Sequence, residues 1–280
     1  MSTRRTIDWG NAGRDPWTNV DRHESPGQLA QLLETRWKIS EMRLLYGRFA
    51  EFCDLLPSRR VLEVGSGTGV FVRALANQLP RIFVGIDLSW QLTLEARRLQ
   101  ASASGGAPLI EFLVGDGAAL PIRDGSFDAS VIITTLGHAS EPLMMLRELA
   151  RALAPGGTLC VLEQDHESFI INHPDRETTR KIFQYFCDTL VANGWSARRV
   201  PGWLKACGMK DIAVSGEMYL AMGYQDHMRS LITRRVDAAV GGGRIMEEMG
   251  RRWLADLEAV VAEDAFFASW NFYFFKGRKA

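Results

Sequence analysis

Three glycines at alternate positions constrain this chain more than any other feature. Gly65, Gly67 and Gly69 follow an apolar run at 61–64, and apolar residues at helical spacing resume at Val70. This pattern predicts a strand, a tight turn and a helix, with the backbone passing close to a ligand. The first N–H groups of such a helix have no partner within it and can bind polar groups. Because many nucleotide-binding folds use such a turn, the turn alone does not identify the ligand.

Two later apolar runs lead to carboxylates at informative positions. The run 82–86 ends on Asp87, about twenty residues after the glycines, and an acid at the tip of a second parallel strand reaches both hydroxyls of a ribose. The run 109–114 leads to Asp116, which can accept a hydrogen bond from an exocyclic adenine amine. We therefore expect the carboxyl ends of these strands to form one ligand site.

Strands and helices alternate over the first part of the chain. Such alternation implies parallel strands with right-handed crossovers, and hence helices on both faces of the sheet. The expected strands lie at about 60–64, 81–87, 109–115, 128–135 and 158–163, and the helices at about 69–78, 90–100 and 141–153. Beyond them we expect helices over 175–193, 197–207, 225–240 and 244–263, and a last strand over 267–276.

Five short motifs occur in a fixed order between residues 60 and 165. They are E-V-G-S-G-T-G at 63–69, G-I-D-L-S at 85–89, G-D-G-A-A-L-P at 115–121, D-G-S-F-D at 124–128 and L-A-P-G-G at 153–157. This series resembles the class I S-adenosylmethionine (SAM) dependent methyltransferases, especially the small-molecule group of ubiquinone/menaquinone-biosynthesis and natural-product enzymes. The glycine pattern is G-x-G-x-G, whereas a dehydrogenase has G-x-G-x-x-G, which argues against NAD.

The resemblance implies both a fold and a cofactor site. The fold is α/β, a Rossmann-like seven-stranded sheet of order 3-2-1-4-5-7-6 with an antiparallel last strand and helical lid elements. The cofactor is SAM, with Glu63 near its methionine end, the glycine turn beneath it, and Leu88 and Ala118 packed on the adenine. The expected cofactor-binding residues are Glu63, Gly65, Gly67, Gly69, Asp87, Leu88, Asp116, Gly117 and Ala118.

The flanks suggest how the chain is organised around this core. We expect a polar N-terminal arm over 1–27 and a single methyltransferase domain over 28–280. Within that domain we expect cap helices at 28–56, a SAM-binding core at 57–165, and a C-terminal half at 166–280 with helical lid insertions at about 166–196 and 223–264. Long insertions at the carboxyl edge of a parallel sheet lie where ligands bind, so the insertions and the cap helices should close over the acceptor.

Two histidines are candidates for a catalytic base. His138 follows the fourth expected strand, and His166 follows the fifth, next to Asp165. A base is needed only if the acceptor atom is still protonated at neutral pH, because the methyl donor is already activated. For His138 the resemblance favours a structural role, in which it holds the loop and helix, over proton transfer. Neighbouring side chains of an extended chain project in different directions, so Asp165 and His166 do not form a pair by default.

The composition limits the partners. The chain has 33 lysines and arginines against 33 acidic residues, so no overall field draws it to nucleic acid or a membrane surface. We interpret the pairs Arg234–Arg235 and Arg251–Arg252 as solvated helix faces. Four cysteines without close pairing or metal-ligand spacing favour a reducing, cytoplasmic setting and no metal. We expect a monomer or homodimer with a small-molecule partner, and neither nucleic acid nor membrane as a partner.

These observations favour methyl transfer from SAM to an oxygen or carbon of a small, partly hydrophobic organic acceptor, in quinone-like or specialised metabolism. No N-P-P-[YF] motif follows the fourth strand, which argues against amino-group methylation of nucleic-acid bases. Two alternatives keep the cofactor. One is an enzyme of the same fold that catalyses a non-methylating rearrangement or cyclisation, and the other is a non-catalytic SAM-binding subunit. Formation of S-adenosylhomocysteine separates methyl transfer from both.

Overall fold

The computed structural model describes residues 15–55, 58–76, 82–102 and 110–280. The strands are β1 (Arg60–Val64), β2 (Ile82–Asp87), β3 (Ile110–Val114), β4 (Phe127–Ile133), β5 (Leu153–Ile171), β6 (Lys210–Ala221) and β7 (Ala268–Arg278). The helices are η1 (Pro16–Arg22), α1 (Pro26–Lys38), α2 (Ser40–Phe52), α3 (Val70–Ala76), α4 (Trp90–Ala101), η2 (Leu136–His138), α5 (Pro142–Ala152), α6 (Arg176–Tyr185), η3 (Phe186–Leu190), α7 (Ser196–Ala206), α8 (Asp226–Gly241) and α9 (Glu247–Ala262).

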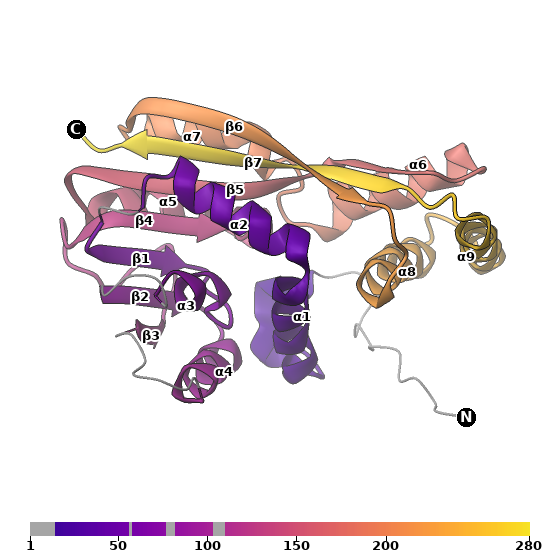
Figure 1. Ribbon diagram of the computed structural model, residues 1–280, viewed down its shortest axis with the longest axis horizontal. Helices are drawn as coiled ribbons and strands as arrows, with labels where there is room; N and C mark the ends of the chain where they lie inside the picture. Colours follow the sequence, from indigo (N-terminus) through magenta and orange to yellow (C-terminus); the bar gives the residue numbers. More distant parts are fainter. Residues whose placement is uncertain (1–14, 56–57, 77–81, 103–109) are drawn as a thin grey trace.

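The strands of the described residues form one sheet in the order β3-β2-β1-β4-β5-β7-β6 (Figure 1). The first five strands are parallel, and β7 is antiparallel to both of its neighbours, β5 and β6. The expected Rossmann-like fold, with its strand order and antiparallel last strand, is therefore confirmed. In this topology the carboxyl ends of β1, β2 and β4 meet at one edge, where open α/β sheets bind ligands.

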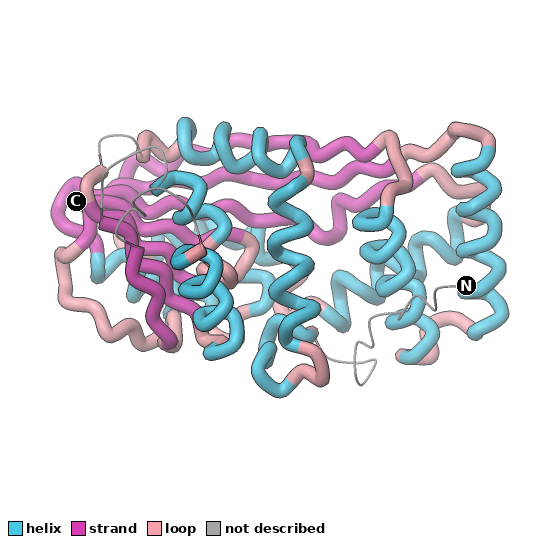
Figure 2. Tube along the Cα trace, turned by 60° about the horizontal axis from the view of Figure 1, so that its bottom comes forward, coloured by secondary structure: helices cyan, strands magenta, loops and turns pink. Residues whose placement is uncertain are grey.

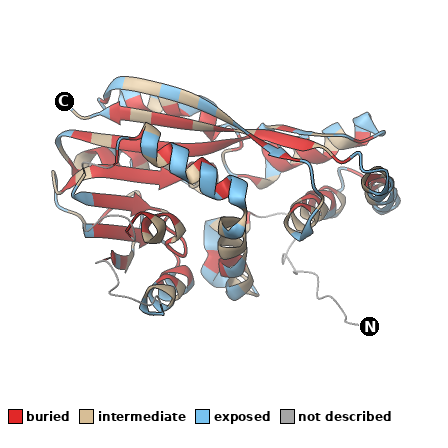
Figure 3. Ribbon diagram, viewed as in Figure 1, coloured by how far each residue is buried: buried red, intermediate tan, exposed pale blue. Residues whose placement is uncertain are grey.

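Alternating residues of the central strands divide the core between the two faces of the sheet. On β1, Val61 packs in a cluster with Phe49 of α2 and Phe71 of α3. Its neighbour Leu62 packs in a second cluster, with Leu146 of α5 and residues of α7. Figure 3 shows the result, with buried strands between helices whose outer surfaces are exposed. Burial of both strand faces follows from parallel connections that place helices on each side.

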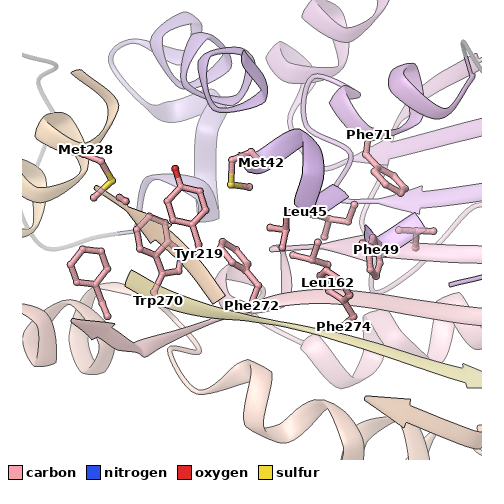
Figure 4. Close-up of a cluster of buried hydrophobic side chains, with 14 of the residues drawn as sticks. Met42, Leu45, Phe49, Phe71, Leu162, Tyr219, Met228, Trp270, Phe272 and Phe274 are labelled. Carbon is pink, nitrogen blue, oxygen red and sulfur yellow. The ribbon is translucent and has the colours of Figure 1, made fainter. Parts of the chain in front are cut away.

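The last three strands of the sheet continue past the others toward α6, α8 and α9 (Figure 1). On this extension the rings of Tyr219 and Trp270 stack with centroids 4.3 Å apart. Figure 4 shows them next to Met42 of α2 and Met228 of α8, within the same buried cluster. The extension thus joins the C-terminal helices to the main core. In Figures 1 and 2, α1 lies between α4 and α8.

β5 is longer than the sequence pattern indicated. The expected end near residue 163 is wrong, because the strand continues to Ile171 and pairs with β7 on both sides of an irregularity between Asp165 and Ile170. Asp165 and His166 therefore lie within a strand and not after it. The reason is long-range, since β7, about a hundred residues later, supplies the hydrogen-bond partners that a strand requires.

The long helix expected over 175–193 is also divided. α6 ends at Tyr185 and continues as the π-helical turn η3. The wider turn leaves the side chains of Phe186 and Cys187 buried. π-helical turns often occur at functional sites, and this one reaches the ligand cavity described below. Among the described helices, none is both long and apolar enough to cross a membrane.

Candidate functional site

The turn after β1 requires glycine at two positions, because of the backbone conformation there and because of the residues packed around it. Gly65 and Gly67 have φ values of +70° and +55°, a region that side chains rarely adopt. A Cβ on Gly65 would lie 2.3 Å from the Oγ1 of Thr135, in the loop after β4. A Cβ on Gly67 would lie 2.8 Å from Cδ1 of Leu33 on α1. The turn is therefore enclosed by β4 on one side and by a cap helix on the other.

Asp87, at the end of β2, reaches across to this turn. Its Oδ2 accepts a hydrogen bond of 2.7 Å from the Gly67 N–H, and its Oδ1 accepts one of 2.9 Å from the Ser89 N–H. Burial raises the pKa of the Asp87 carboxyl, and these two N–H groups oppose that rise. A carboxylate has lone pairs for further donors, so Asp87 can also accept hydrogen bonds from ligand hydroxyls.

A cavity of about 390 Å³ begins at the glycine turn. Gly65, Gly67, Asp87 and Leu88 line one end of it. Leu88 is 64% exposed at this end of the cavity and offers an apolar surface to a ligand. The cavity continues past η1 and α1 to residues of β5, β7, η3 and α8. One continuous space therefore joins the turn to the C-terminal helices.

Five of the expected cofactor-binding residues do not line this cavity. Asp116 is exposed at the end of β3, where its Oδ1 accepts a hydrogen bond of 2.8 Å from the Ala118 N–H. Gly117 is buried, and a Cβ there would lie 2.5 Å from Cε of Met145. Ala118 is half-buried beside them. These three residues lie next to the cavity end formed by Asp87, because Gly115 N–H donates to Asp87 O at 2.9 Å.

The other two are Glu63 and Gly69. Glu63 is buried, and its Oε2 has no hydrogen-bond partner among the described residues. Burial raises the pKa of Glu63 to about 8, so the carboxyl holds a proton at neutral pH. A Cβ on Gly69 would lie 2.3 Å from the ring of Phe112 on β3. Gly69 therefore packs closely against β3 beneath the turn, where there is no room for a side chain.

The N-terminal segment 15–22 closes one wall of the cavity. A polar arm was expected over 1–27; residues 1–14 of it lie outside the described residues, and residues 16–22 form the 3-10 helix η1. The carboxylate of Asp21 accepts hydrogen bonds from Ser89 Oγ at 2.5 Å, from Trp90 N–H at 2.9 Å and from Gln91 N–H at 3.1 Å. Asp21 thereby caps the first turn of α4 from a distant part of the chain.

The two candidate histidines lie near each other, with ring centroids 6.2 Å apart, and both line the cavity. The Nδ1 of His138 is 2.5 Å from the Oδ2 of Asp15. His166 is buried, and its Nδ1 has no hydrogen-bond partner among the described residues. Burial, aided by the charges of His138 and Arg235, holds the pKa of His166 well below its usual value. His166 is therefore neutral at physiological pH. Its neighbour Asp165 does not pair with it, because the Asp165 carboxylate accepts hydrogen bonds from Arg198.

The interpretation of Arg234 and Arg235 as a solvated helix face was wrong. Arg235 is 2% exposed, Arg234 is half-buried, and both line the cavity. Arg235 occupies the stripe of α8 that also holds the buried Ile232, three residues earlier, so it faces inward with its neighbours. Burial lowers the pKa of Arg234 to about 10 and that of Arg235 well below its usual value. Arg251 and Arg252 are exposed, as expected.

Several lining residues were missed by the sequence analysis. Arg235 could have been found, because it falls at helical spacing within an apolar stripe. Arg36 likewise follows Leu33 by three positions on α1. Asp15 and Asp21 gave no local signal, since their partners are far along the chain. No group of histidine, cysteine, aspartate or glutamate in the described ranges could hold a metal ion.

Comparison with known proteins shows which proteins this chain is similar to. Residues 62–161 match the family model described as a methyltransferase domain. The chain is 30% identical over 227 residues to an uncharacterised transposon-encoded protein of Streptomyces fradiae, covering 79% of this chain and 62% of that protein. It is 36% identical over 114 residues to a demethylmenaquinone methyltransferase of Renibacterium salmoninarum, covering 41% of this chain and 45% of that protein. The chain thus spans less than two thirds of either relative.

A solved structure supports the fold. The crystal structure of a putative methyltransferase from Bacillus halodurans superimposes with a TM-score of 0.54 at 16% identity, covering 84% of this chain and 98% of that one. The matched family segment contains the glycine turn, the Asp87 strand and the loop of Asp116, in the order of the motifs. Residues 62–161 of this chain are therefore similar to a methyltransferase domain, and the chain as a whole has the fold of the methyltransferase structure that it resembles.

Proposed function

We propose that this protein transfers the methyl group of SAM to an oxygen or carbon atom of a small, partly hydrophobic organic acceptor, in quinone-like or specialised metabolism. The observation that carries the proposal is the single cavity that joins the glycine turn and Asp87 to His138 and His166. A cofactor bound at the turn would present its reactive end to an acceptor inside the protein. The volume of about 390 Å³ is in the range of small-molecule sites, and one relative is named a demethylmenaquinone methyltransferase.

The cofactor end of the cavity fits SAM in two respects. The Asp87 carboxylate, held by two backbone N–H groups, is placed to accept hydrogen bonds from ribose hydroxyls. The exposed Leu88 supplies an apolar surface for the adenine, with Ala118 as its counterpart. We assign Asp116 to the adenine amine and Glu63 to the methionine end. The backbone of Gly65, Gly67, Gly69 and Gly117 would lie along the ligand.

When bound, SAM supplies a methyl group that is already activated for in-line displacement. The protein then has to align the acceptor and keep water out, and alignment alone can provide a large part of the acceleration. Residues of η1, α1, η3 and α8 surround the cavity and would exclude water from it. The cap helix α1 and the two insertions that carry η3 and α8 were expected from the sequence to meet at this edge, whereas η1 was not.

His138 is the better candidate for a base. Its Nδ1 is bonded to the Asp15 carboxylate, which leaves the Nε2 to take a proton from an acceptor hydroxyl and stabilises the charge that results. His166, neutral and with an unpartnered Nδ1, is placed to accept a hydrogen bond from the acceptor and orient it. In this proposal His138 takes a proton from the acceptor and His166 orients the acceptor, so His138 does more than hold its loop.

We further propose that the domain extends over 28–280 and that the protein acts in the cytoplasm, as a monomer or homodimer, on a free small molecule and not on nucleic acid. The support is the net charge of zero, together with sequence patterns that predict no exposed row of lysine and arginine side chains. A long phosphate backbone requires clustered surface cations. Arg234 and Arg235 line the cavity, and the exposed pair Arg251–Arg252 is balanced by acidic residues of its own helix.

Calorimetry and product analysis test the proposal. We expect the protein to bind SAM and S-adenosylhomocysteine, and Asp87→Ala to weaken both by about 2 kcal/mol if two charge-assisted hydrogen bonds are lost. A library of phenolic and quinol acceptors should then yield S-adenosylhomocysteine with at least one compound. Conversion of an acceptor without S-adenosylhomocysteine would favour the rearranging or cyclising alternative. SAM binding without any turnover would favour the non-catalytic subunit.

A further inference from the structure

Arg235 is a buried cation without a carboxylate partner in the described part of the chain. One of its Nη1 hydrogens is donated to the backbone oxygen of Leu231 at 3.2 Å, and its Nε has no partner. The guanidinium lies over the rings of Phe186, at 4.2 Å from the centroid, and Phe169, at 5.0 Å. Ring faces compensate part of the charge, but they leave the donors along the edge of the guanidinium unused.

Other cations surround the same part of the cavity. Arg234 and Arg36 line it together with Arg235, and so does His227. The charge of Arg234 adds to burial in lowering the pKa of Arg235, so the two guanidinium groups repel each other. Burial and the neighbouring arginines lower the pKa of His227 to about 4, which keeps that imidazole neutral. This part of the cavity therefore holds three arginine side chains close to one another.

Three of the four carboxylates that line the cavity are engaged elsewhere. Asp15 is bonded to His138, Asp21 caps α4, and Asp87 holds the glycine turn. Asp237 lies two residues after Arg235 on α8, so its side chain points to another side of the helix, where it is exposed. None of these four is bonded to the guanidinium of Arg235.

We propose that the methyl acceptor carries an oxyanion, a carboxylate or phosphoryl group on an aromatic or otherwise apolar body, and that Arg235 binds this group. The inference rests on the proposed function, because it names the class of substrate for that same cavity. A planar fork of N–H donors matches two oxygens of a carboxylate or phosphate, and an arginine presents that fork already formed. The aromatic rings of Phe186 and Trp270, which also line the cavity, suit the apolar body.

The position of Arg235 assigns the anion to the acceptor and not to SAM. α8 lies on the far side of α1 from α4 and the glycine turn (Figure 1). The ring of Phe186, on which Arg235 stacks, is 5.8 Å from the ring of His166. An acceptor anchored by its anion at Arg235 would extend past His166 toward His138 and the turn. Its reacting atom would then lie between the candidate base and the methyl group.

A matched set of ligands and variants tests the assignment on the full-length protein. The probes are benzoate, phenyl phosphate and the neutral benzamide, and their dissociation constants are measured by ligand-observed NMR. Arg235→Met removes the charge and keeps the length, and Arg235→Lys keeps the charge without the planar fork. Arg229→Met is the control, because Arg229 lies on the same helix but pairs with Glu258 at the surface. SAM affinity and melting temperature are measured for every variant.

We expect the wild type to bind benzoate or phenyl phosphate at least tenfold more tightly than benzamide. Arg235→Met should lose this preference by about tenfold to a hundredfold, Arg235→Lys should keep part of it, and Arg229→Met should keep all of it. In the absence of a probe, Arg235→Met should melt at the same or a higher temperature, because a buried charge without an ionic partner is removed. The preferred anion identifies the group as carboxylate or phosphoryl.

Three results would overturn the assignment. The first is a wild type that does not distinguish benzoate and phenyl phosphate from benzamide, and the second is an anion preference that survives in Arg235→Met. The third is a loss of SAM affinity in Arg235→Met as large as the loss of anion affinity, which would assign Arg235 to the cofactor's own carboxylate. Failure of the wild type to bind SAM would instead refute the proposed function, and the probe measurements would still report on Arg235 separately.

Discussion

Asp15 Oδ2 and His138 Nδ1 are 2.5 Å apart, although 123 residues separate them in the sequence. This contact fastens the segment before η1 to the loop after β4. A second fastening, from Asp21 to the first turn of α4, lies at the other end of η1. Segment 15–22 is therefore held at both ends across the cavity, and it belongs to the wall of the site.

The first prediction concerns this segment. Asp21→Ala removes the acceptor for three hydrogen bonds at the start of α4, and lost caps of this kind cost about 1 kcal/mol. We expect faster hydrogen exchange in 15–22 and in the first turn of α4, with weaker SAM binding because Ser89 and its neighbour Leu88 become less ordered. Arg22→Ala, at an exposed position of the same helix, is the control. Unchanged exchange in Asp21→Ala would show that η1 is held by packing alone.

The second prediction concerns proton transfer. If His138 is the base and Asp15 positions it, His138→Ala and Asp15→Asn should both slow methyl transfer to acceptors with a protonated hydroxyl, by about a hundredfold or more for the base. Acceptors that are ionised before binding should be spared. His166→Ala should raise KM more than it lowers kcat, since it orients the acceptor. Equal losses for ionised and protonated acceptors would assign His138 to a structural role.

The central part of the fold could be predicted because its signals are local. The glycine turn, the strand ending on Asp87 and the alternation of strands and helices depend on short stretches of sequence, and all of them agree with the structure. The length of β5 could not be predicted, because residues beyond 163 are stabilised as a strand by β7. The division between α6 and η3 depends in the same way on the packing of Phe186 inside the cavity.

The two ends of the site differ in the same respect. The end that we propose for the cofactor is formed by motifs that lie at fixed distances along the chain, so its residues could be proposed from the sequence. The end that we propose for the acceptor is assembled from α1, α8, η1 and η3, which are brought together only by the tertiary fold. Arg235 shows the difficulty, because an arginine pair on an amphipathic helix is usually solvated. Its inward position follows from the phase of the apolar stripe around Ile232.

The third prediction separates the roles of two glycines. Gly67→Val should abolish detectable SAM binding with a smaller loss of stability, because valine is strained at a φ of +55° but its Cβ meets only the flexible end of Leu33, in the ligand's path. Gly65→Val should also unfold at a clearly lower temperature, since its Cβ would lie 2.3 Å from Thr135 Oγ1 in the core of the turn. Calorimetry and thermal unfolding measure both effects. SAM affinity in Gly67→Val equal to that of the wild type would refute the site.

The fourth prediction uses the pH dependence of stability. Burial raises the pKa of Glu63 from its ordinary value of 4.5 to about 8 in the folded protein. The folded state therefore keeps a proton that the unfolded state has lost, so this contribution is complete below pH 4.5 and disappears as the pH rises to about 8. Each unit between the two pKa values is worth about 1.4 kcal/mol, so the loss amounts to a few kcal/mol.

Glu63→Gln should remove this dependence. The amide cannot ionise, so the variant should lose less unfolding free energy than the wild type between pH 5 and pH 8, as measured by urea denaturation at intervals. Glu51→Gln, at an exposed position on α2, is the control and should follow the wild-type curve. A Glu63→Gln curve parallel to that of the wild type would mean that the folded protein keeps Glu63 ionised.

The last prediction tests whether the C-terminal helices form a lid that is stabilised separately from the cofactor core. Trp253 of α9 is 1% exposed, stacks on His173 with centroids 4.2 Å apart, and donates its indole N–H to Thr179 Oγ1 of α6 at 2.9 Å. Trp253→Phe keeps a ring but removes this donor, which should cost about 1 kcal/mol.

We expect faster hydrogen exchange in α8 and α9 and weaker binding of benzoate, with unchanged exchange in β1 and β2 and unchanged SAM affinity. Trp195→Phe, at an exposed position, is the control. If exchange in β1 and β2 accelerates together with that in α9, the helices belong to one cooperative unit with the core, and a lid that opens by itself is ruled out.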